Sequence, residues 1–255
     1  MFGFGNKKPK WGIALGGGGA RGYAHLGVLE ALREKGIEPD IISGVSAGAI
    51  AGAFISSGKT PREAFEIIKE YRFTDFTKFR IPRNGLLSLE KLKARLKEEI
   101  EQENIEDLKI PLVIAVSNIL KGKVEYLDSG PLADIVEASA SIPVLFSPVQ
   151  LEGGLYCDGG LFDNLPITPL RKKCKNIIAV SISPVNELDT ISGILEIAAR
   201  TFQLSVNHGI HKIKKSCKVF IEPTGLYEYD IMDTKHADEI FKLGYDHVKQ
   251  MDISS

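Results

Sequence analysis

Cysteine is scarce in this chain. The 255 residues include Cys157, Cys174 and Cys217, and no two of them form a CxxC pair. An odd number of cysteines without paired spacing disfavours a disulfide scaffold and a zinc site, and it is typical of a reducing compartment. The N-terminal residues also contain no apolar segment of the kind found in secretion signals. We therefore expect a cytoplasmic protein.

A surplus of charge of either sign is also missing. Lys and Arg number 32 and Asp and Glu number 33, which gives a formal net charge of −1. Without a positive surplus the attraction to a phosphate backbone is weak, so we expect no nucleic-acid partner. Hydrophobic residues make up 44% and charged residues 25%, which is typical of a globular protein and argues against a disordered or fibrous one.

Residues 41–58 form an uncharged stretch that could be mistaken for a transmembrane helix. Gly44, Gly48 and Gly52 recur in it at the spacing of a membrane-helix dimerisation motif. The stretch is rich in serine and glycine, and it is at the short limit for crossing a bilayer. A buried strand that leads into a buried helix explains it better.

Strand-like and helix-like segments alternate along the chain, without repeats or a dividing linker. This alternation predicts an α/β architecture with a largely parallel sheet, and we expect residues 1–255 to form a single domain. We also expect Asp163 and Asn164 to cap a helix that starts near Pro166. The predicted strands cover residues 11–15, 40–43, 111–118, 123–127, 176–183 and 218–221. The predicted helices cover residues 24–32, 47–58, 60 onwards, 89–102, 131–142, 188–214 and 236–250.

A nucleophile candidate lies between the second predicted strand and its helix. Residues 44–48 read Gly-Val-Ser-Ala-Gly and match GxSxG, in the strand–turn–helix context that this motif needs. A tight turn presents the Ser46 hydroxyl outward, and Gly44 and Gly48 let the backbone approach closely. The following helix N-terminus favours a developing negative charge. A packing turn without chemistry is the alternative.

A glycine-rich loop follows the first predicted strand. Residues 16–22 read Gly-Gly-Gly-Gly-Ala-Arg-Gly, and such a loop can point several bare N–H groups at an anion. A dinucleotide-binding loop would need an acid at the end of the second strand, and Asp40 precedes that strand instead. A phosphate-binding P-loop ending at Gly58-Lys59-Thr60 fails because Ala53 replaces the required glycine. An oxyanion hole facing Ser46 fits better, because adjacent strand-to-helix turns lie at the same sheet edge.

A serine nucleophile needs a base, and Asp158 is the strongest candidate. It lies in a glycine-rich turn, Gly153–Gly160, where a carboxylate can approach another loop. Such a carboxylate needs burial to raise its proton affinity. From the residues alone, a Ser–Asp pair and a Ser–Asp–His triad both remain open. The histidines that could complete a triad are His25, His208, His211, His236 and His247, of which His25 is better explained as a packing or capping residue.

Taken in order, three motifs resemble the patatin-like phospholipase family. They are Gly-Gly-Gly-Ala-Arg-Gly at 17–22, Gly-Val-Ser-Ala-Gly at 44–48 and Asp-Gly-Gly at 158–160, and the resemblance runs from about Lys10 to Ser183. It implies a three-layer α/β fold, with a mostly parallel central sheet flanked by helices. The region after Ser183 carries no matching motif.

The resemblance also implies a chemistry and a set of roles. Ser46 would be the nucleophile and Asp158 its base, without a catalytic histidine. The oxyanion hole would come from Gly17, Gly18 and Gly19, with Arg21 holding the loop. The implied reaction is hydrolysis of a carboxylic ester of an acyl lipid through an acyl-serine, with no metal or organic cofactor. A catalytically silent protein that binds lipid or a partner on the same fold is the alternative.

One further segment suggests contact with lipid. Residues 72–83 interleave three phenylalanines with cations, and one hypothesis is that they form an interfacial lid that gives peripheral membrane contact. The alternative is slightly favoured: phenylalanines at a spacing of three are typical of a helix that packs on the core, with the cations in water. The sequence does not determine the oligomeric state or the headgroup of the lipid.

Overall fold

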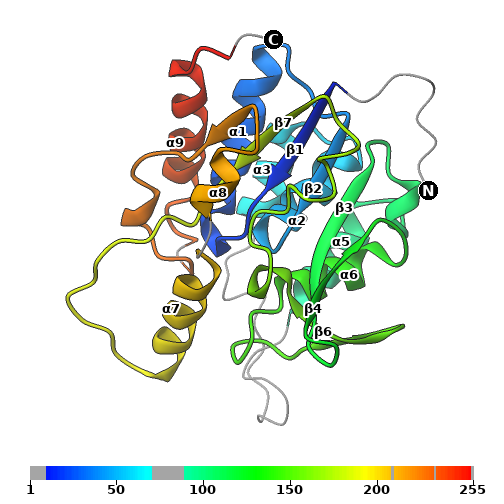
Figure 1. Cartoon of the computed structure of the whole chain (residues 1–255), viewed down its shortest axis with the longest axis vertical. Coiled ribbons are helices and arrows are strands. Elements are labelled where there is room, and N and C mark those ends of the chain that lie inside the picture. Colours follow the sequence, from blue (N-terminus) through cyan, green and yellow to red (C-terminus); the bar gives the residue numbers. More distant parts are fainter. Residues whose placement is uncertain (1–9, 71–88, 208–209, 233, 254–255) are drawn as a thin grey trace.

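The computed structural model describes residues 10–70, 89–207, 210–232 and 234–253. Its strands form a single sheet in the order β5-β6-β3-β2-β1-β7-β8, and β4 pairs with β3 outside this path (Figure 1). The strands are β1 (Trp11–Leu15), β2 (Ile41–Gly44), β3 (Leu112–Asn118), β4 (Lys123–Leu127), β5 (Val149–Leu151), β6 (Gly154–Asp158), β7 (Asn176–Val180) and β8 (Val219–Ile221).

The centre of the sheet is parallel. Strands β3, β2, β1, β7 and β8 all run in one direction, and Leu15 lies opposite both Gly44 and Val180. The carboxyl ends of β1, β2 and β7 therefore lie at one level. This is the edge of an α/β sheet at which ligands usually bind.

Strand β3 is longer than its parallel neighbour β2 and has antiparallel partners further along. β4 pairs with it from Ile114 to Asn118 and so occupies one of its two edges over that length. β2 pairs with Ile114 through Gly44, and β6 pairs with Val116 through Asp158. Since one edge is taken by β4, β2 and β6 must follow each other along the other edge. The carboxyl end of β2 and that of β6 therefore meet.

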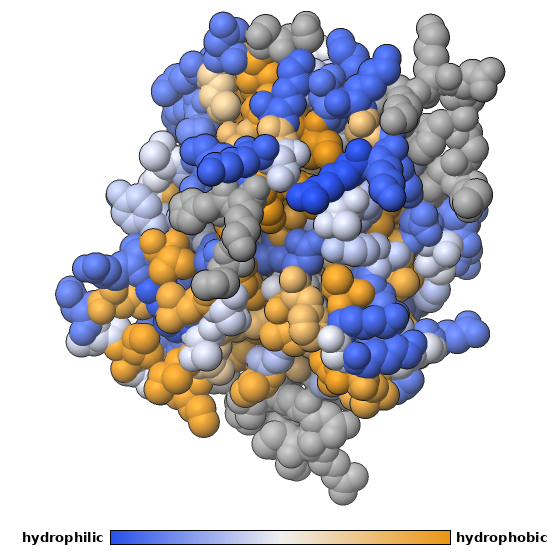
Figure 2. Space-filling model, in the orientation of Figure 1, coloured by the Kyte–Doolittle hydropathy of each residue, from blue (hydrophilic) through white to orange (hydrophobic). Residues whose placement is uncertain are grey.

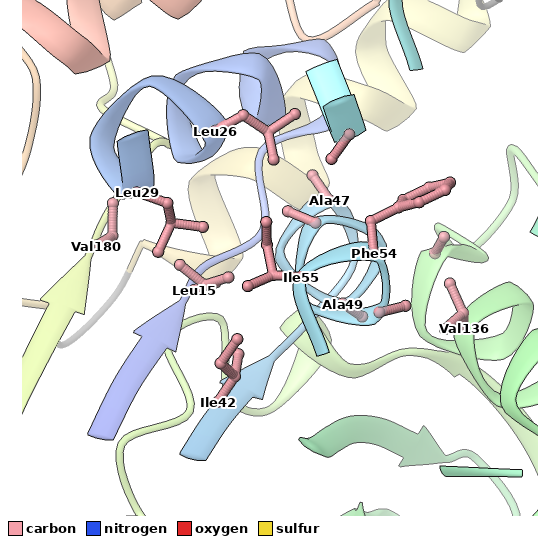
Figure 3. Packing of buried hydrophobic residues seen from close by; sticks show 14 of the residues in the cluster. Leu15, Leu26, Leu29, Ile42, Ala47, Ala49, Phe54, Ile55, Val136 and Val180 are labelled. Carbon is pink, nitrogen blue, oxygen red and sulfur yellow. The ribbon is translucent and has the colours of Figure 1, made fainter. Parts of the chain in front are cut away.

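Helices cover one face of the sheet. They are α1 (Tyr23–Glu34), α2 (Ala47–Ser56), α3 (Pro61–Lys69), α5 (Glu90–Glu99), α6 (Leu132–Ala140) and α9 (Ala237–Gln250). Figure 3 shows Leu15, Ile42 and Val180 of the strands in one cluster with side chains of α1, α2 and α6. Helix α2 is built largely of alanine and glycine, and at Gly52 an added Cβ would lie 3.0 Å from Leu112. Small residues thus allow α2 to pack close to the sheet.

The other face of the sheet has a smaller core. Ala14, Ile41 and Val113 point to it and pack against a turn-rich segment, residues 165–174. Ile213 of α8 (Ile210–Lys214) also contacts this cluster. Because the central strands are buried on both faces, they are apolar along most of their length. The prediction of a three-layer α/β fold with helices about a largely parallel sheet is confirmed.

Two predicted helices are wrong. The helix expected over 188–214 begins only at α7 (Ile194–Val206), because Gly193 has a φ of 88° that a helix cannot continue, and α8 is separate. The helix expected near Pro166 is replaced by turns. Asp163 instead accepts hydrogen bonds from the Leu165 N–H and the Tyr126 hydroxyl. Apolar residues recur at helical spacing before Ile194 and after Pro166, but they lie in a loop and in turns.

Most other predicted elements occur near their expected positions. Thr60 caps α3 with the expected capping box to Glu63. The hairpin of β5 and β6 was not predicted. Short 3-10 turns complete the described elements, at η1 (Gly19–Gly22), η2 (Ile105–Asp107), η3 (Gly159–Leu161) and η4 (Leu226–Glu228).

No helix within the described ranges is both long enough and apolar enough to cross a membrane.

Candidate active site

Ser46 lies on a sharp turn between β2 and α2. Its φ of 54° and ψ of −123° are unusual for a residue with a side chain, and such backbone strain is concentrated at functional sites. The flanking glycines make the turn sterically feasible. A Cβ at Gly44 would lie 2.5 Å from the Gly48 carbonyl oxygen, and one at Gly48 would lie 2.1 Å from that of Leu15.

A serine on α6 holds this turn in place. The Ser46 N–H donates to the Ser139 hydroxyl at 2.9 Å, and that hydroxyl donates to the Ala115 carbonyl oxygen at 2.8 Å. The turn is thereby connected to β3, the strand that also pairs with β6. Ser46 itself is buried, with 6% of its surface exposed.

Asp158 ends β6 and is buried beside Ser46. Its Oδ1 accepts a hydrogen bond from the Gly160 N–H at 2.8 Å. Its Oδ2 has no hydrogen-bond partner within the described parts of the chain. Burial raises the pKa of Asp158 to about 7, and the Ser46 hydroxyl and the Gly160 N–H offset part of that rise. An aspartate with such a pKa can accept a proton near neutral pH.

The predicted motif residues meet at a small cavity of about 20 Å³. Ser46 and Asp158 line it, together with the glycine loop and Asn164. Sequence reasoning placed Ser46 and the glycine loop at one sheet edge. Sequence reasoning did not predict that β6 pairs with β3. This pairing brings the Asp158 carboxylate to the sheet edge where Ser46 lies.

The N–H groups of the glycine loop are not equivalent. The Gly17 N–H donates to the Asn164 carbonyl oxygen at 3.1 Å, and the Ala20 N–H donates to that of Ile231 at 2.7 Å. Within the described residues, the N–H groups of Gly18 and Gly19 make no such bond. Gly19 has a φ of 59°, and a Cβ there would lie 2.2 Å from the Ile231 carbonyl oxygen.

Two buried side chains hold the loop. Arg21 donates from Nε to the Tyr229 carbonyl oxygen at 2.8 Å and from Nη1 to that of Pro184 at 2.9 Å. Burial lowers the pKa of Arg21 to about 10, so its guanidinium stays charged at neutral pH. His25 contacts the Gly16 carbonyl oxygen through Nε2 at 2.7 Å. Burial lowers the pKa of His25 to about 4, which makes the neutral ring the donor.

None of the histidines with a described side chain serves as a base at this cavity. His25 is fully buried against Gly16, and neither His236 nor His247 lines the cavity. His208 and the side chain of His211 lie outside the described residues. The geometry therefore supports the Ser–Asp pair more than the triad among the side chains that can be placed.

A second, larger cavity begins at Ser46 and is almost wholly apolar. Its volume is about 120 Å³, and it extends along α2 between the surrounding helices. On α2 its lining residues are Ala47, Ile50, Ala51 and Phe54, which recur at the spacing of one helix face. The remaining wall includes Leu26, Ile68, Leu92, Leu96 and Phe146.

Sequence reasoning missed several residues of the site. Asn164 lies between two glycine turns, and its Oδ1 is 2.4 Å from where a Cβ of Gly17 would lie. The region after Ser183 supplies Phe202, Gln203 and Ile231 to the cavity that holds Ser46. No local motif marks the residues after Ser183, and Asn164 was expected only as a helix cap. Residues 72–83, for which a lid was one of two hypotheses, lie outside the described residues.

The described part of the chain gathers no group of three His, Cys, Asp or Glu side chains that could hold a metal ion. The residues brought together at the cavity are Ser46, Asp158 and the glycine loop. Together with the sheet, they define an α/β protein that presents a strained serine beside a buried aspartate and a glycine loop.

A model of the family described as patatin-like phospholipase matches residues 13–171. The chain belongs to the patatin-like phospholipase family.

Similar proteins agree with this assignment. An uncharacterized NTE family protein of Mycobacterium tuberculosis is 34% identical over 182 residues, which cover 70% of this chain and 51% of that protein. Lysophospholipase NTE1 of Saccharomyces cerevisiae is 27% identical over 271 residues, covering 92% of this chain and 16% of that protein. The chain thus spans about half the length of the mycobacterial relative and less of the yeast one.

The fold has a counterpart among solved structures. The structure of VipD from Legionella pneumophila superposes with a TM-score of 0.53 and 16% sequence identity. The match covers 96% of this chain and 66% of that one. At this identity the likeness concerns the fold alone, and it includes the region after Ser183 that carries no motif.

Proposed function

We propose that this protein hydrolyses a carboxylic ester of an acyl lipid through an acyl-serine intermediate. The observation that carries the proposal is the placement of the Asp158 carboxylate. It is buried beside the Ser46 hydroxyl, its Oδ2 has no hydrogen-bond partner within the described residues, and its pKa is raised to about 7. A carboxylate in that state can take the serine proton as the hydroxyl attacks.

The reaction proceeds in two halves. Ser46 Oγ attacks the ester carbonyl carbon while its proton passes to Asp158, and a tetrahedral oxyanion forms. The N–H groups of Gly18 and Gly19 stabilise that oxyanion, and Gly17 shapes the space beside it. The intermediate collapses, the alcohol leaves with the proton from Asp158, and the acyl group remains on Ser46. A water molecule, deprotonated by Asp158, then releases the fatty acid and regenerates the serine.

The larger cavity supports an acyl lipid as the substrate. Its apolar wall starts at Ser46, so an acyl chain bound there would place its ester carbonyl at the nucleophile. Burial of methylene groups along such a wall contributes about 0.8 kcal/mol each. The relative named lysophospholipase NTE1 is consistent with a lipid that carries one acyl chain.

Three variants test the proposal. Ser46→Ala and Asp158→Asn should each lower hydrolysis of a p-nitrophenyl ester by at least about a thousandfold, while thermal unfolding shows an intact fold. Asp163→Asn is the matched control. Its carboxyl group is partly buried and also has a raised pKa, but it bonds Tyr126 and does not line the cavity with Ser46. It should retain activity within a few-fold.

The outcomes separate the alternatives. Activity that survives in Asp158→Asn and is lost in a histidine variant would replace the pair by a triad. If a fluorophosphonate probe failed to label the folded wild-type protein, a lipid-binding protein without catalysis would be the better description.

A further inference from the structure

Helix α7 presents hydrophobic side chains on both of its sides. On the inner side Phe202 and Val206 line the cavity that holds Ser46 and Asp158. On the outer side Ile194, Ile197 and Leu204 are 75%, 51% and 50% exposed. Surface helices usually turn polar residues outward, so the outer side of α7 has the composition of a contact surface.

The loop before α7 extends this surface. Val185, Leu188 and Ile191 are all exposed, and the Arg200 guanidinium fastens the loop to the helix by donating to the Asn186 carbonyl oxygen. We call the six exposed side chains of this loop and helix the apolar face: Val185, Leu188, Ile191, Ile194, Ile197 and Leu204. Figure 2 shows hydrophobic atoms gathered over α7 and this loop, at the lower left. Exposed apolar clusters of this kind mark interaction sites.

Further exposed apolar residues lie near residues that line the cavity of Ser46 and Asp158. Leu161 and Phe162 follow Asp158 closely and are exposed, and η3, which contains Leu161, contacts α7. On the loop after α6, Val144 is 60% exposed although its φ is 73°, a costly conformation for a β-branched residue. Its near neighbour Ile142 lines both cavities. Exposed apolar side chains therefore lie close in the chain to Asp158 and Ile142, which line the cavity that holds Ser46.

We propose that the apolar face docks on the surface of a zwitterionic lipid bilayer and so brings the catalytic cavity against its substrate. This inference rests on the proposed acyl-lipid hydrolysis, because a water-soluble substrate would need no such surface. Docking places exposed aliphatic side chains among the headgroups and upper acyl chains, which is how amphipathic helices bind interfaces. An acyl chain then passes from one apolar environment to another.

The charges of the segment favour this occupant over a second copy of the chain. Glu187, Asp189 and Glu196 are exposed among the aliphatic residues, and the guanidinium of Arg200 is engaged by Asn186 and Gln203. A symmetric dimer would bring the same acidic patch of both copies together. The ammonium groups of a choline headgroup instead attract these carboxylates. An anionic bilayer would repel them.

The test compares vesicle binding with hydrolysis in solution. Ile194→Ser, Ile197→Ser and Leu204→Ser are combined in the full chain, and co-sedimentation with phosphatidylcholine vesicles is measured. Binding should weaken at least about tenfold, because three aliphatic side chains no longer enter the interface. Hydrolysis of lysophosphatidylcholine presented in these vesicles should fall with it. Hydrolysis of a monomeric p-nitrophenyl butyrate should be unchanged.

Tyr227→Ser is the matched control, since Tyr227 is 46% exposed on η4, outside the apolar face. It should bind vesicles as the wild-type protein does. Addition of phosphatidylserine should not strengthen wild-type binding. A requirement for anionic lipid, reversed by salt, would overturn the proposal and point to the cations of segment 72–87.

Two other results also overturn it. One is equal vesicle binding by the triple variant and the wild-type protein. The other is a wild-type dimer in gel filtration that becomes a monomer in the triple variant without loss of vesicle binding. Failure of the proposed function looks different. If the wild-type protein hydrolyses no ester but the triple variant still loses vesicle binding, docking stands and hydrolysis does not.

Discussion

Asp158 lies two residues beyond Gly44 along the same edge of β3. Gly44 pairs with Ile114 and Asp158 pairs with Val116, while β4 occupies the opposite edge. A parallel strand and an antiparallel strand thus end at one point from opposite directions. The turn that carries Ser46 begins where β2 ends, and Asp158 is the last residue of β6. Two loops that are far apart in the sequence are therefore held side by side by strands that pair with the same edge of β3.

The conformation of Gly19 should be essential for activity. In Gly19→Ala the new Cβ would collide with the Ile231 carbonyl oxygen, so the N–H groups of the loop must move. We expect kcat to fall by about a hundredfold or more, the typical effect of losing an oxyanion donor. The measurement is steady-state hydrolysis of p-nitrophenyl butyrate.

Gly36→Ala is the control for this change. Gly36 also has a positive φ, of 73°, but nothing lies within 4 Å of an added Cβ. It should lose about 1 kcal/mol of stability from backbone strain and keep its activity. Equal losses of activity in the two variants would show that the position of the loop near Ile231 is unimportant.

Activity should rise with pH through the pKa of Asp158. Burial raises that pKa to about 7, and the proposed mechanism needs the ionised carboxylate. We therefore expect kcat/KM to increase up to about pH 7 and to level off above it. A profile that is flat between about pH 5 and about pH 9 would show that Asp158 is not the base.

The same ionisation should lower stability as pH rises. The pKa of Asp158 is raised from 3.8 to about 7 by folding, so the folded state holds its proton more tightly than the unfolded state does. The stabilisation from the neutral carboxyl is complete below the unfolded pKa and is lost as pH rises through the folded pKa. Asp158→Asn should gain melting temperature relative to wild type at pH 8, and much less at pH 4, in calorimetry. A constant difference between the two proteins would contradict this assignment.

His25 should act on catalysis through the glycine loop. Its ring donates to the Gly16 carbonyl oxygen inside the core, and His25→Leu would leave that oxygen without its donor. We expect this variant to lose about 1–3 kcal/mol of stability and to lower kcat more than it changes KM. His25→Gln restores a donor at a similar reach and should recover much of both. Chemical denaturation and steady-state kinetics measure the two effects, and failure of glutamine to rescue either would argue for bulk packing alone.

The length of the larger cavity should set the preferred acyl chain. Ala51 lies about 7.5 Å along α2 from Ser46, at 1.5 Å per residue, and it lines the cavity. In Ala51→Leu the added atoms would fill the cavity at that depth. Hydrolysis of the p-nitrophenyl butyrate ester should persist, while hydrolysis of the dodecanoate ester should fall by about tenfold or more. If both esters decline equally, the acyl chain binds elsewhere.

Local sequence signals determined much of this protein. The apolar strands, the GxSxG turn and the Thr60 capping box depend on residues close in the chain, so their periodicity and glycines predict them directly. From the sequence, Asp158 would need burial to act as a base; in the structure it is 1% exposed and burial raises its pKa to about 7. The helix predicted over 188–214 is wrong before Ile194, because apolar spacing alone does not show that Gly193 adopts a positive φ and keeps the preceding residues in a loop.

Tertiary structure alone decided the rest. Ser46 and Asp158 are neighbours because β2 and β6 pair with the same edge of β3. The carbonyl oxygens of Asn164 and Ile231 accept hydrogen bonds from two N–H groups of the glycine loop and so decide which of its N–H groups remain unbonded within the described residues. These are contacts between segments far apart in the sequence, and no local propensity encodes them. The sequence therefore determined which groups can do the chemistry. The packing of the chain decided which of them meet, because burial, strand pairing and steric contact act only between segments that the fold has brought together.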